Sequence, residues 1–457
     1  MALKSIQCQR EFQQIASTRK SWRRRLRETF AFRRLKCILS DSSYMQRLPG
    51  FRDFYPEEFA FRNYLFDNWR RVARSFGFVE YDGPTLEPTE LYKKKSGEEL
   101  KTQLFRFVDQ GNRDVCMRPE MTPTLARLVA ARAREYRKPI KWFSISPFFR
   151  FEKPQKGRLR EFYQINCDII GDDSPAADAE LIGLAIALHR VFGLTETDFL
   201  VRINNRNLWA EFLIKHQQPI ERLSEFLSII DRLEREKEEV TAGKLRSFQL
   251  DLAAVREFLG TPPGSVPGFS ELFREIQWRG LEGFVQLDLT IVRGLDYYTG
   301  LVFEIFDREK ENRSLAGGGR YNNLISTISE GETDLPAAGF AIGDVTFTKL
   351  LQGLDHTRQR VDYALRTPCG AFIVIADEMR RPEALELAQT LRRSGVIVDY
   401  SLQPTKVARQ FQQAGTVGAK YAVVIGQEWP QVRVKLLAER TEQILSKDDL
   451  SLFLGDN

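Results

Sequence analysis

Residues 149–164 read FRFEKPQKGRLREFYQ, a basic stretch in which aromatic side chains lie between the charges. Five of these sixteen residues are Lys or Arg. Strand-like runs flank the centre of the stretch, WFSISPFFRFE at 142–152 and REFYQINCDII at 160–170, and a Lys-Gly pair stands in the segment between them. The pattern predicts a β-hairpin with a charged loop.

Alternate residues of a strand share one face of a sheet, which places Arg150 with Glu152 and Phe162 with Gln164. An arginine on a sheet floor can bind a phosphate through two parallel hydrogen bonds, and an aromatic ring beside it can stack on a base. The hairpin alone leaves three interpretations open: a solvated charged surface, a nucleic-acid patch, or the floor of a phosphate-binding site.

Two further stretches contain residues suited to a small polar substrate. IVRGLDYYTGLVFEIF at 291–306 places Arg293 at a strand-to-turn junction, followed by Tyr297 and Tyr298; a hairpin with an aromatic turn is the alternative. MRPEMTPTLAR at 117–127 places Glu120 and Thr122 on one face if it is extended, where both can accept hydrogen bonds from an ammonium group.

One glycine-rich stretch, AGGGRYNNL at 316–324, is interpreted as a tight turn, because glycine is the default residue wherever the backbone needs a positive φ. The chain has no GxxxxGK[ST] loop, no GxGxxG at a strand-to-helix turn and no GxSxG elbow. These absences argue against P-loop, dinucleotide-binding and serine-hydrolase chemistry.

The order of elements predicts an α+β domain followed by an α/β domain. We expect a mixed, mostly antiparallel sheet within residues 45–365, interrupted by a charged helical insertion at about 207–281. From AFIVIA onward the pattern alternates strand and helix, which predicts a separate parallel-sheet domain at 366–457. No run is long and apolar enough to cross a bilayer.

The positive charge is concentrated at the start of the chain. Residues 1–44 contain eleven Lys or Arg and three acids, a net of +8, so that the rest carries −2 of the total of +6. This basic leader is interpreted in three ways: an over-extended start before Met45, an organelle transit peptide, or a basic arm that binds nucleic acid.

Cysteine and histidine are scarce and do not form a metal-binding pattern. The five cysteines include no CxxC pair, which fits a reducing compartment, and the three histidines have no metal-ligand spacing. We therefore expect neither a zinc site nor a histidine-based triad, and expect the chemistry to depend on Arg, Glu and backbone groups.

Several motifs in one order now resemble a known family. FRFEKPQKGRLREFYQ resembles motif 2 of the class II aminoacyl-tRNA synthetases, and GFVEYDGPTLEP resembles their motif 1. MRPEMTPTLAR, VRGLDYYTG, AGGGRYNNL and the opening LPGFRDFYP together resemble the histidyl-tRNA synthetases. The resemblance extends over about residues 46–457.

The resemblance implies an enzyme that activates histidine with ATP. Arg150 would hold the α-phosphate, Glu152 the adenine amino group, Arg158 the γ-phosphate, and Phe162 would stack on adenine. Arg293 would lie opposite Arg150 across the reacting carboxylate and phosphate. The histidine pocket would be formed by Glu120 and Thr122 at the α-amino group and by Gln164, Asp168, Tyr297, Tyr298 and Tyr321 around the rest of the substrate.

The resemblance also implies cofactors, partners and a location. Mg2+ would accompany ATP, with Glu304 as either a metal ligand or a structural strand residue. No zinc, haem, nicotinamide or flavin is expected. The partners would be histidine, tRNA(His) and a second copy of the chain in a homodimer, with no membrane. The expected location is the cytoplasm, or an organelle if the leader is a transit peptide.

One segment departs from the family pattern. Motif 3 usually ends in a Gly-x-Glu-Arg-like segment whose arginine clamps ATP, whereas GFAIGDVTFTKLL at 339–351 has Asp344, Val345 and Thr346 there. The departure favours a rival hypothesis, an inactive paralogue that regulates ATP phosphoribosyltransferase in histidine biosynthesis. The intact motif 2 residues and the C-terminal domain favour the synthetase. A non-catalytic nucleic-acid-binding module is the third hypothesis, which the acidic remainder of the chain opposes.

Overall fold

The computed structural model describes residues 46–93, 102–152, 158–233, 236–261, 269–293, 297–309, 314–365 and 369–455. The basic leader at 1–44 and the Lys-Gly centre of the basic hairpin lie outside these ranges. The chain divides into two units, Met1–Asp53 and Phe54–Asn457, and every element described below belongs to the second. No helix of the described residues is long and apolar enough to span a membrane.

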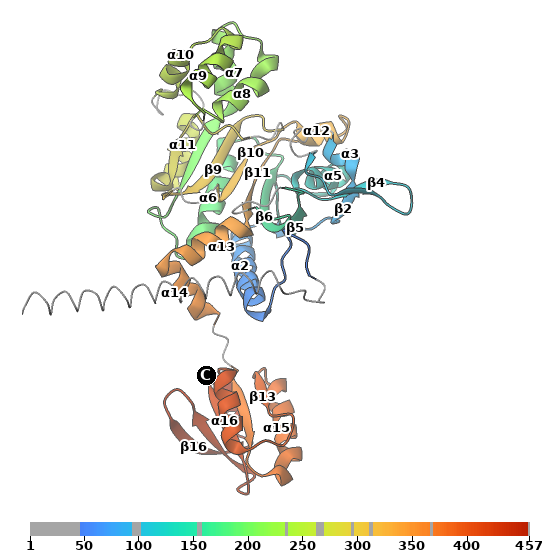
Figure 1. Ribbon diagram of the computed structural model, residues 1–457, viewed down its shortest axis with the longest axis vertical. Helices are drawn as coiled ribbons and strands as arrows, with labels where there is room; N and C mark the ends of the chain where they lie inside the picture. The colour runs from blue at the N-terminus through green and yellow to red at the C-terminus, as the bar shows by residue number, and fades with distance from the viewer. Residues whose placement is uncertain are drawn as a thin grey trace, which may run out of the picture. The chain divides into compact units, whose positions relative to one another are not determined.

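The pairing of the two predicted strands is confirmed, but the first strand ends at Phe149, so Arg150 and Glu152 follow it and do not share the predicted strand face. Strands β5 (Ile140–Phe149) and β6 (Glu161–Ile170) pair antiparallel along their whole length, from Ile140 opposite Ile170 to Phe149 opposite Glu161. They belong to an eight-stranded sheet in the order β1-β5-β6-β11-β10-β9-β7-β8 (Figure 1). The other strands are β1 (Val79–Glu80), β7 (Phe199–Asn205), β8 (Val285–Leu287), β9 (Leu301–Asp307), β10 (Ala316–Arg320) and β11 (Ala337–Gly343).

The sheet is mixed and mostly antiparallel, as predicted. Only the outer pairs β1–β5 and β7–β8 are parallel, and the five pairs between them are antiparallel. The run FVQLDLTIV at 284–292 forms only the short strand β8, because pairing with β7 ends at Leu287. The backbone then turns at Asp288, whose carboxylate accepts hydrogen bonds from Thr290.

The two faces of β6 have opposite character, as the alternation along a strand requires. Ile165, Cys167 and Ile169 are buried in the main hydrophobic core, whereas Gln164 and Asp168 face a cavity. The core also contains the buried apolar side chains of α2 (Pro56–Ser75) and the apolar face of α6 (Pro175–Arg190). Ser174 caps α6, and its Oγ accepts a hydrogen bond from Ala177 N at 3.3 Å.

On the face of the sheet opposite the main hydrophobic core, helices enclose a second buried cluster. It joins α5 (Thr122–Arg132) and α12 (Leu324–Ile328) to the rings of Tyr297, Tyr298 and Tyr321. The chain between α2 and α5 forms a separate three-stranded sheet. Its strands lie in the order β2 (Leu86–Pro88), β4 (Asp114–Met117) and β3 (Arg106–Val108), and the short helix α3 (Thr89–Lys93) follows β2 in sequence.

The glycine-rich stretch is a strand, so its interpretation as a tight turn is wrong. Gly317, Gly318 and Gly319 are central residues of β10, paired on both sides, and none has a positive φ. Each lies where a side chain would collide: Gly317 with the Arg293 guanidinium, Gly318 with Phe340 and a backbone carbonyl, and Gly319 with Tyr298. Glycine is present here because neighbouring groups approach the backbone closely, not because the chain turns.

The insertion is helical, as predicted. Its helices are α7 (Arg206–Lys215), α8 (Leu223–Ile230), α9 (Glu238–Leu245), α10 (Leu252–Leu259) and α11 (Phe269–Trp278). The helix that follows β11 is α13 (Asp344–Gly353), and α14 (Asp355–Ala364) comes next. The exact domain boundaries at 207–281 and 365/366 stay predictions.

The C-terminal sheet contains the predicted parallel strands and two that were missed. β12 (Ala371–Ile375), β13 (Val398–Tyr400) and β14 (Tyr421–Ile425) are parallel, with α15 (Arg381–Arg393) and α16 (Val407–Thr416) between them. β15 (Gln431–Leu436) and β16 (Thr441–Ser446) extend the sheet antiparallel, and α17 (Leu450–Gly455) follows. The sheet is therefore mixed, not purely parallel.

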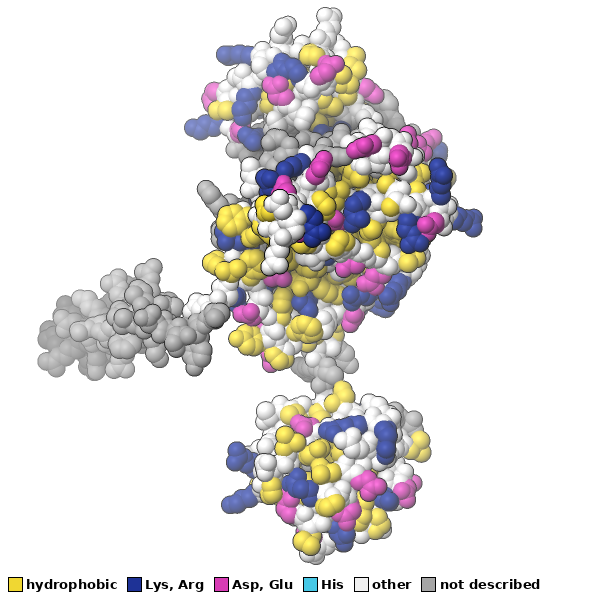
Figure 2. All heavy atoms as spheres, turned by 90° about the vertical axis from the view of Figure 1, so that its right-hand side faces the viewer, with side chains coloured by type: hydrophobic (Ala, Val, Ile, Leu, Met, Phe, Trp, Pro, Cys, Tyr) yellow, Lys and Arg dark blue, Asp and Glu magenta, His cyan; other side chains and the backbone are white. Residues whose placement is uncertain are grey.

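Charges of both signs lie on the face of the molecule that Figure 2 draws. On the face drawn in Figure 2, Lys and Arg side chains of the described residues are interspersed with Asp and Glu.

Candidate active site

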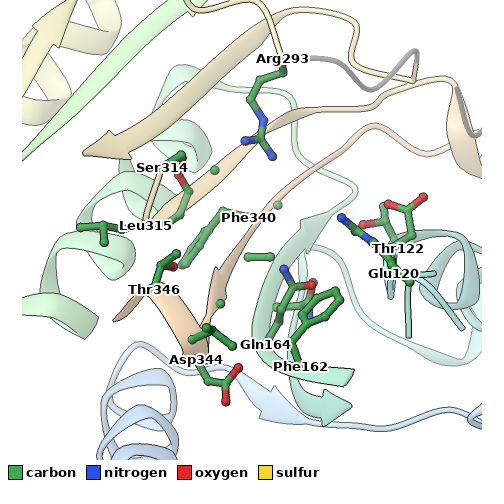
Figure 3. A pocket seen from close by; sticks show the side chains of 18 of the residues that line it. Glu120, Thr122, Phe162, Gln164, Arg293, Ser314, Leu315, Phe340, Asp344 and Thr346 are labelled. Atoms are coloured by element: carbon green, nitrogen blue, oxygen red, sulfur yellow. Dashed lines mark hydrogen bonds between the residues drawn. The ribbon is translucent and has the colours of Figure 1, made fainter. Parts of the chain in front are cut away.

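A cavity of about 460 Å³ opens above the face of the sheet formed by β6, β11 and β10. All twelve residues that the sequence assigned to ATP or histidine line it, although they come from segments as distant as Glu120 and Tyr321. They are Glu120, Thr122, Arg150, Glu152, Arg158, Phe162, Gln164, Asp168, Arg293, Tyr297, Tyr298 and Tyr321. Figure 3 labels Glu120, Thr122, Phe162, Gln164 and Arg293 among them. Glu304 lies under Arg293 and is not part of the lining.

One end of the cavity holds a buried carboxylate. Asp168 is almost fully buried, and Tyr321 donates a hydrogen bond from its hydroxyl to Asp168 Oδ1 at 2.5 Å. Burial raises the pKa of Asp168 to about 7, while the Tyr321 hydrogen bond acts in the opposite direction. The side chain lies flat on the sheet because Gly339 beneath it has no Cβ. A carboxylate of this kind suits a ligand group that titrates near neutral pH.

A second acidic group lies at the start of α5. Glu120 is buried, and its Oε2 accepts a hydrogen bond from the Tyr297 hydroxyl at 2.9 Å. Thr122 is the first residue of α5, one position before the proline that opens the helix. A buried carboxylate and a neighbouring hydroxyl present two acceptors, which is the arrangement that an ammonium group requires.

Arg293 projects into the cavity from the opposite side (Figure 3). Its Nη1 forms an ion pair of 2.5 Å with Glu304 Oε1, its guanidinium lies over Gly317, and its Nε has no hydrogen-bond partner among the described residues. The backbone has a φ of +54°, an uncommon conformation for a non-glycine residue. Strain of this kind is often found at functional sites, where surrounding contacts maintain it.

The basic hairpin supplies the other end of the cavity. Arg150 lies with its guanidinium carbon 5.3 Å from the centroid of the Phe162 ring, and its Nε donates to the Pro119 carbonyl at 2.9 Å. Arg158 and Glu152 form an ion pair of 2.6 Å. Two arginines beside a half-buried aromatic ring can form a site for a phosphate attached to a planar ring.

The segment that departs from motif 3 also lines the cavity. Asp344 is buried at the start of α13 and its Oδ1 accepts a hydrogen bond from Tyr163 N at 2.9 Å, which ties this corner to β6. Val345 and Thr346 follow it in the lining, and the arginines among the described lining residues are those at 150, 158 and 293. No described arginine takes the place of the motif 3 arginine.

The sequence missed several lining residues. Asn166 lies on β6 between Gln164 and Asp168, and the period of two along the strand would have identified it. Gly317 and Gly339 escaped notice because a glycine needed for close approach looks the same in sequence as one needed for a turn. Gln103, Ser314 and Leu315 carried no sequence signal.

Histidine side chains take no part in this site. His189 is buried in the core, its Nδ1 lies 2.7 Å from the Ala185 carbonyl, and its ring stacks on Phe199. Among the described residues, no group of three or more His, Cys, Asp or Glu side chains could hold a metal ion.

Two family models match the chain: histidyl-tRNA synthetase at residues 50–344 and an anticodon-binding domain at residues 371–456. The histidine–tRNA ligase of Opitutus terrae is 42% identical over 90% of this chain and 98% of its own length. The chloroplastic/mitochondrial histidine–tRNA ligase of Arabidopsis thaliana is 34% identical over 88% and 85%. The crystal structure of histidyl-tRNA synthetase from Nostoc matches with a TM-score of 0.70 at 22% identity, over 90% of this chain and 99% of that one.

The mixed sheet, the cavity above it and the C-terminal domain define an aminoacyl-tRNA synthetase. Within that class, the chain belongs to the histidyl-tRNA synthetase family.

Proposed function

We propose that the protein is a histidine–tRNA ligase, which forms histidyl-adenylate from histidine and ATP and transfers the histidyl group to tRNA(His). The observation that carries this proposal is the single cavity with Asp168 and Tyr321 at one end and Arg150 and Phe162 at the other. The first end suits an imidazole, the second suits a nucleotide, and the reaction joins the two ligands between them.

The residues of the cavity divide into a histidine half and an ATP half. Asp168 binds the imidazole, with Tyr298 and Tyr321 beside it, while Glu120 and Thr122 bind the α-ammonium group next to Tyr297. Gln164 lies where the two halves meet.

In the ATP half, Phe162 stacks on the adenine. Arg150 holds the α-phosphate. Arg158 breaks its ion pair with Glu152 and binds the γ-phosphate instead. The freed Glu152 carboxylate can then accept a hydrogen bond from the adenine amino group.

Catalysis follows from placing cations around two anions. The carboxylate of histidine attacks the α-phosphorus of ATP, and pyrophosphate leaves, so negative charge spreads over the phosphorus oxygens in the transition state. In this proposal Arg150 and Arg293, which both line the cavity, stabilise that charge. The reaction needs no covalent enzyme intermediate, because positioning and electrostatic stabilisation suffice.

ATP would enter as its magnesium complex, in which the metal would neutralise part of the phosphate charge. Glu304 stays a prediction as a magnesium ligand. In the structure the Glu304 carboxylate forms an ion pair with Arg293. This ion pair holds the Arg293 guanidinium above Gly317.

The rival hypothesis, a regulatory paralogue, is supported by the motif 3 departure. Arg150, Glu152, Arg158 and Phe162 are all present at the cavity, and relatives named histidine–tRNA ligase match along nearly the whole chain. The lack of a described third arginine at the triphosphate end predicts weaker ATP binding, not loss of activity.

We further propose a homodimer in the cytoplasm. The dimer rests on the resemblance of GFVEYDGPTLEP to motif 1, and the match to an anticodon-binding domain supports tRNA as the partner of the C-terminal region. Import into an organelle is the alternative if residues 1–44 act as a transit peptide.

Aminoacylation of tRNA tests the proposal. The full chain is incubated with total tRNA, MgATP and each of the twenty amino acids in turn, and acid-precipitable label is counted. We expect histidine alone to be incorporated, and only into tRNA(His). Histidine binding without charging would contradict the proposal and support the regulatory paralogue.

Histidine affinity should pass through a maximum near pH 6.5–7. The complex holds one proton between Asp168 and the imidazole, the free imidazole has a pKa of about 6.5, and Asp168 titrates at about 7. Below the maximum both groups are protonated and one proton must leave; above it neither is protonated and one must be taken up. Calorimetric titration of histidine from pH 5 to pH 9 measures both limbs.

Asp168→Asn supplies the matched control for this profile. The variant has no carboxylate to protonate, so the alkaline limb should disappear while the acidic limb, which belongs to the imidazole, remains. An alkaline limb that persists in the variant would show that a group other than Asp168 causes it.

A further inference from the structure

Asn166 is a buried polar residue of the cavity to which the chemistry above gives no role. It is 5% exposed, it lines the cavity, and its Nδ2 has no hydrogen-bond partner among the described residues. Leaving a buried amide group unpaired is unfavourable, so such groups in native proteins require an explanation. A ligand that completes the hydrogen bonds of the amide is the explanation that its place in the lining favours.

The position of Asn166 along β6 indicates which part of the substrate it meets. Gln164, Asn166 and Asp168 share one face, and alternate residues on a strand are about 6.6 Å apart. In histidine, about five bonds of ~1.4–1.5 Å separate the distal ring nitrogen from the carboxyl carbon, a span of about 6 Å. When the ring lies at Asp168, the main-chain end of histidine therefore lies over Asn166.

The pairing of strands across the sheet independently places the main-chain end of histidine near Asn166. Asn166 pairs with Ala341 on β11, and Ala341 pairs with Gly317 on β10, so the three residues form one row on the cavity face. The Arg293 guanidinium lies over Gly317 at the far end of this row. Between Asn166 and Arg293 the row contributes only a methyl group, which leaves space for the reacting carboxylate and its α-carbon.

We propose that the Asn166 carboxamide is a substrate-binding residue that hydrogen-bonds the main-chain end of bound histidine. This inference rests on the proposed function. A carboxamide offers both a donor and an acceptor, so the partner is either the carboxylate or the α-ammonium group. In either case Asn166 fixes the distance between the ring at Asp168 and the carboxylate that attacks ATP.

The test compares three ligands on the full-length wild-type chain and on Asn166→Ala by calorimetric titration. Histidine has both main-chain groups, histamine lacks the carboxylate, and 3-(imidazol-4-yl)propionate lacks the ammonium group. We expect Asn166→Ala to weaken histidine binding by about 10- to 100-fold, as for one hydrogen bond to a charged group. The analogue that keeps the contacted group should lose affinity to the same extent, and the other should lose none.

Ser144→Ala is the matched control, because Ser144 lies opposite Asn166 on β5 but its Oγ already hydrogen-bonds with Ser146 Oγ at 2.7 Å. A thermal unfolding scan without ligand separates binding from structure: Asn166→Ala should not lower the midpoint, since the Nδ2 that it removes has no hydrogen-bond partner in the described ranges. Equal losses for both analogues, unchanged histidine affinity, or a lowered midpoint would each overturn the inference. Wild-type protein that binds no histidine would overturn the proposed function as well.

Discussion

Arg293→Ala is expected to reduce histidine-dependent ATP–pyrophosphate exchange by about 10²- to 10³-fold, the usual cost of removing one preorganised donor to a transition-state anion. Arg293 lines the cavity and is held by Glu304, and its Nε has no hydrogen-bond partner within the described part of the chain. Histidine affinity should change far less, by less than about tenfold, because the charge that Arg293 stabilises is largest in the transition state.

Exchange rates and calorimetric histidine binding, measured on the same preparation, separate the two effects. Arg279→Ala serves as the control, because Arg279 also forms an ion pair, with Glu275 at 2.6 Å, but does not line the cavity. This control should retain full exchange. If histidine binding by Arg293→Ala collapsed while the exchange rate at saturating histidine persisted, Arg293 would be a substrate-holding or structural residue, and the catalytic role would be wrong.

Gly317→Ala is expected to reduce exchange nearly as far as Arg293→Ala while the protein remains folded. A Cβ at Gly317 would collide with the guanidinium of Arg293, and this is the mobile end of a long side chain, so that it can move away. The displaced arginine would no longer face the reacting atoms, and a displacement of about 1 Å is enough to cost ~10²-fold.

Substitutions at two other glycines, Gly300 and Gly318, serve as controls for Gly317→Ala. A Cβ at Gly300 would meet Arg320 at 3.7 Å, an ordinary contact, so Gly300→Ala should behave as wild type. A Cβ at Gly318 would meet the backbone and Cβ of Phe340, which cannot move away, so Gly318→Ala should lower the thermal midpoint. Gly317→Ala with wild-type exchange would show that Arg293 does not depend on the glycine beneath it.

The hairpin and its site residues were predictable because local pattern decides them. The alternation of β6 separates Ile165 and Cys167 from Gln164 and Asp168, and an alternation of this kind follows from strand geometry alone. The resemblance of several motifs then grouped residues as distant as Glu120 and Tyr321, which the structure places around one cavity. Their individual roles stay predictions.

What the sequence could not supply depends on contacts between distant segments. Gly317 needs to be glycine because of Arg293 and Gly339 because of Asp168, and no local signal distinguishes such glycines from those of a turn. The hydrogen bond from Tyr321 to Asp168 joins residues 153 positions apart, so the pKa of Asp168 could not be anticipated. The last two strands of the C-terminal sheet were missed because the β-α-β alternation ends before them.

The most direct test of the central claim is ATP–pyrophosphate exchange by the full-length wild-type chain, with and without histidine. Radiolabelled pyrophosphate is supplied with MgATP, and its incorporation into ATP is measured in the absence of tRNA. The cavity geometry predicts exchange that requires histidine and that the other nineteen amino acids do not support. Intact histidine binding without any exchange would contradict the assignment as an enzyme, and would identify the protein as a histidine-binding regulator.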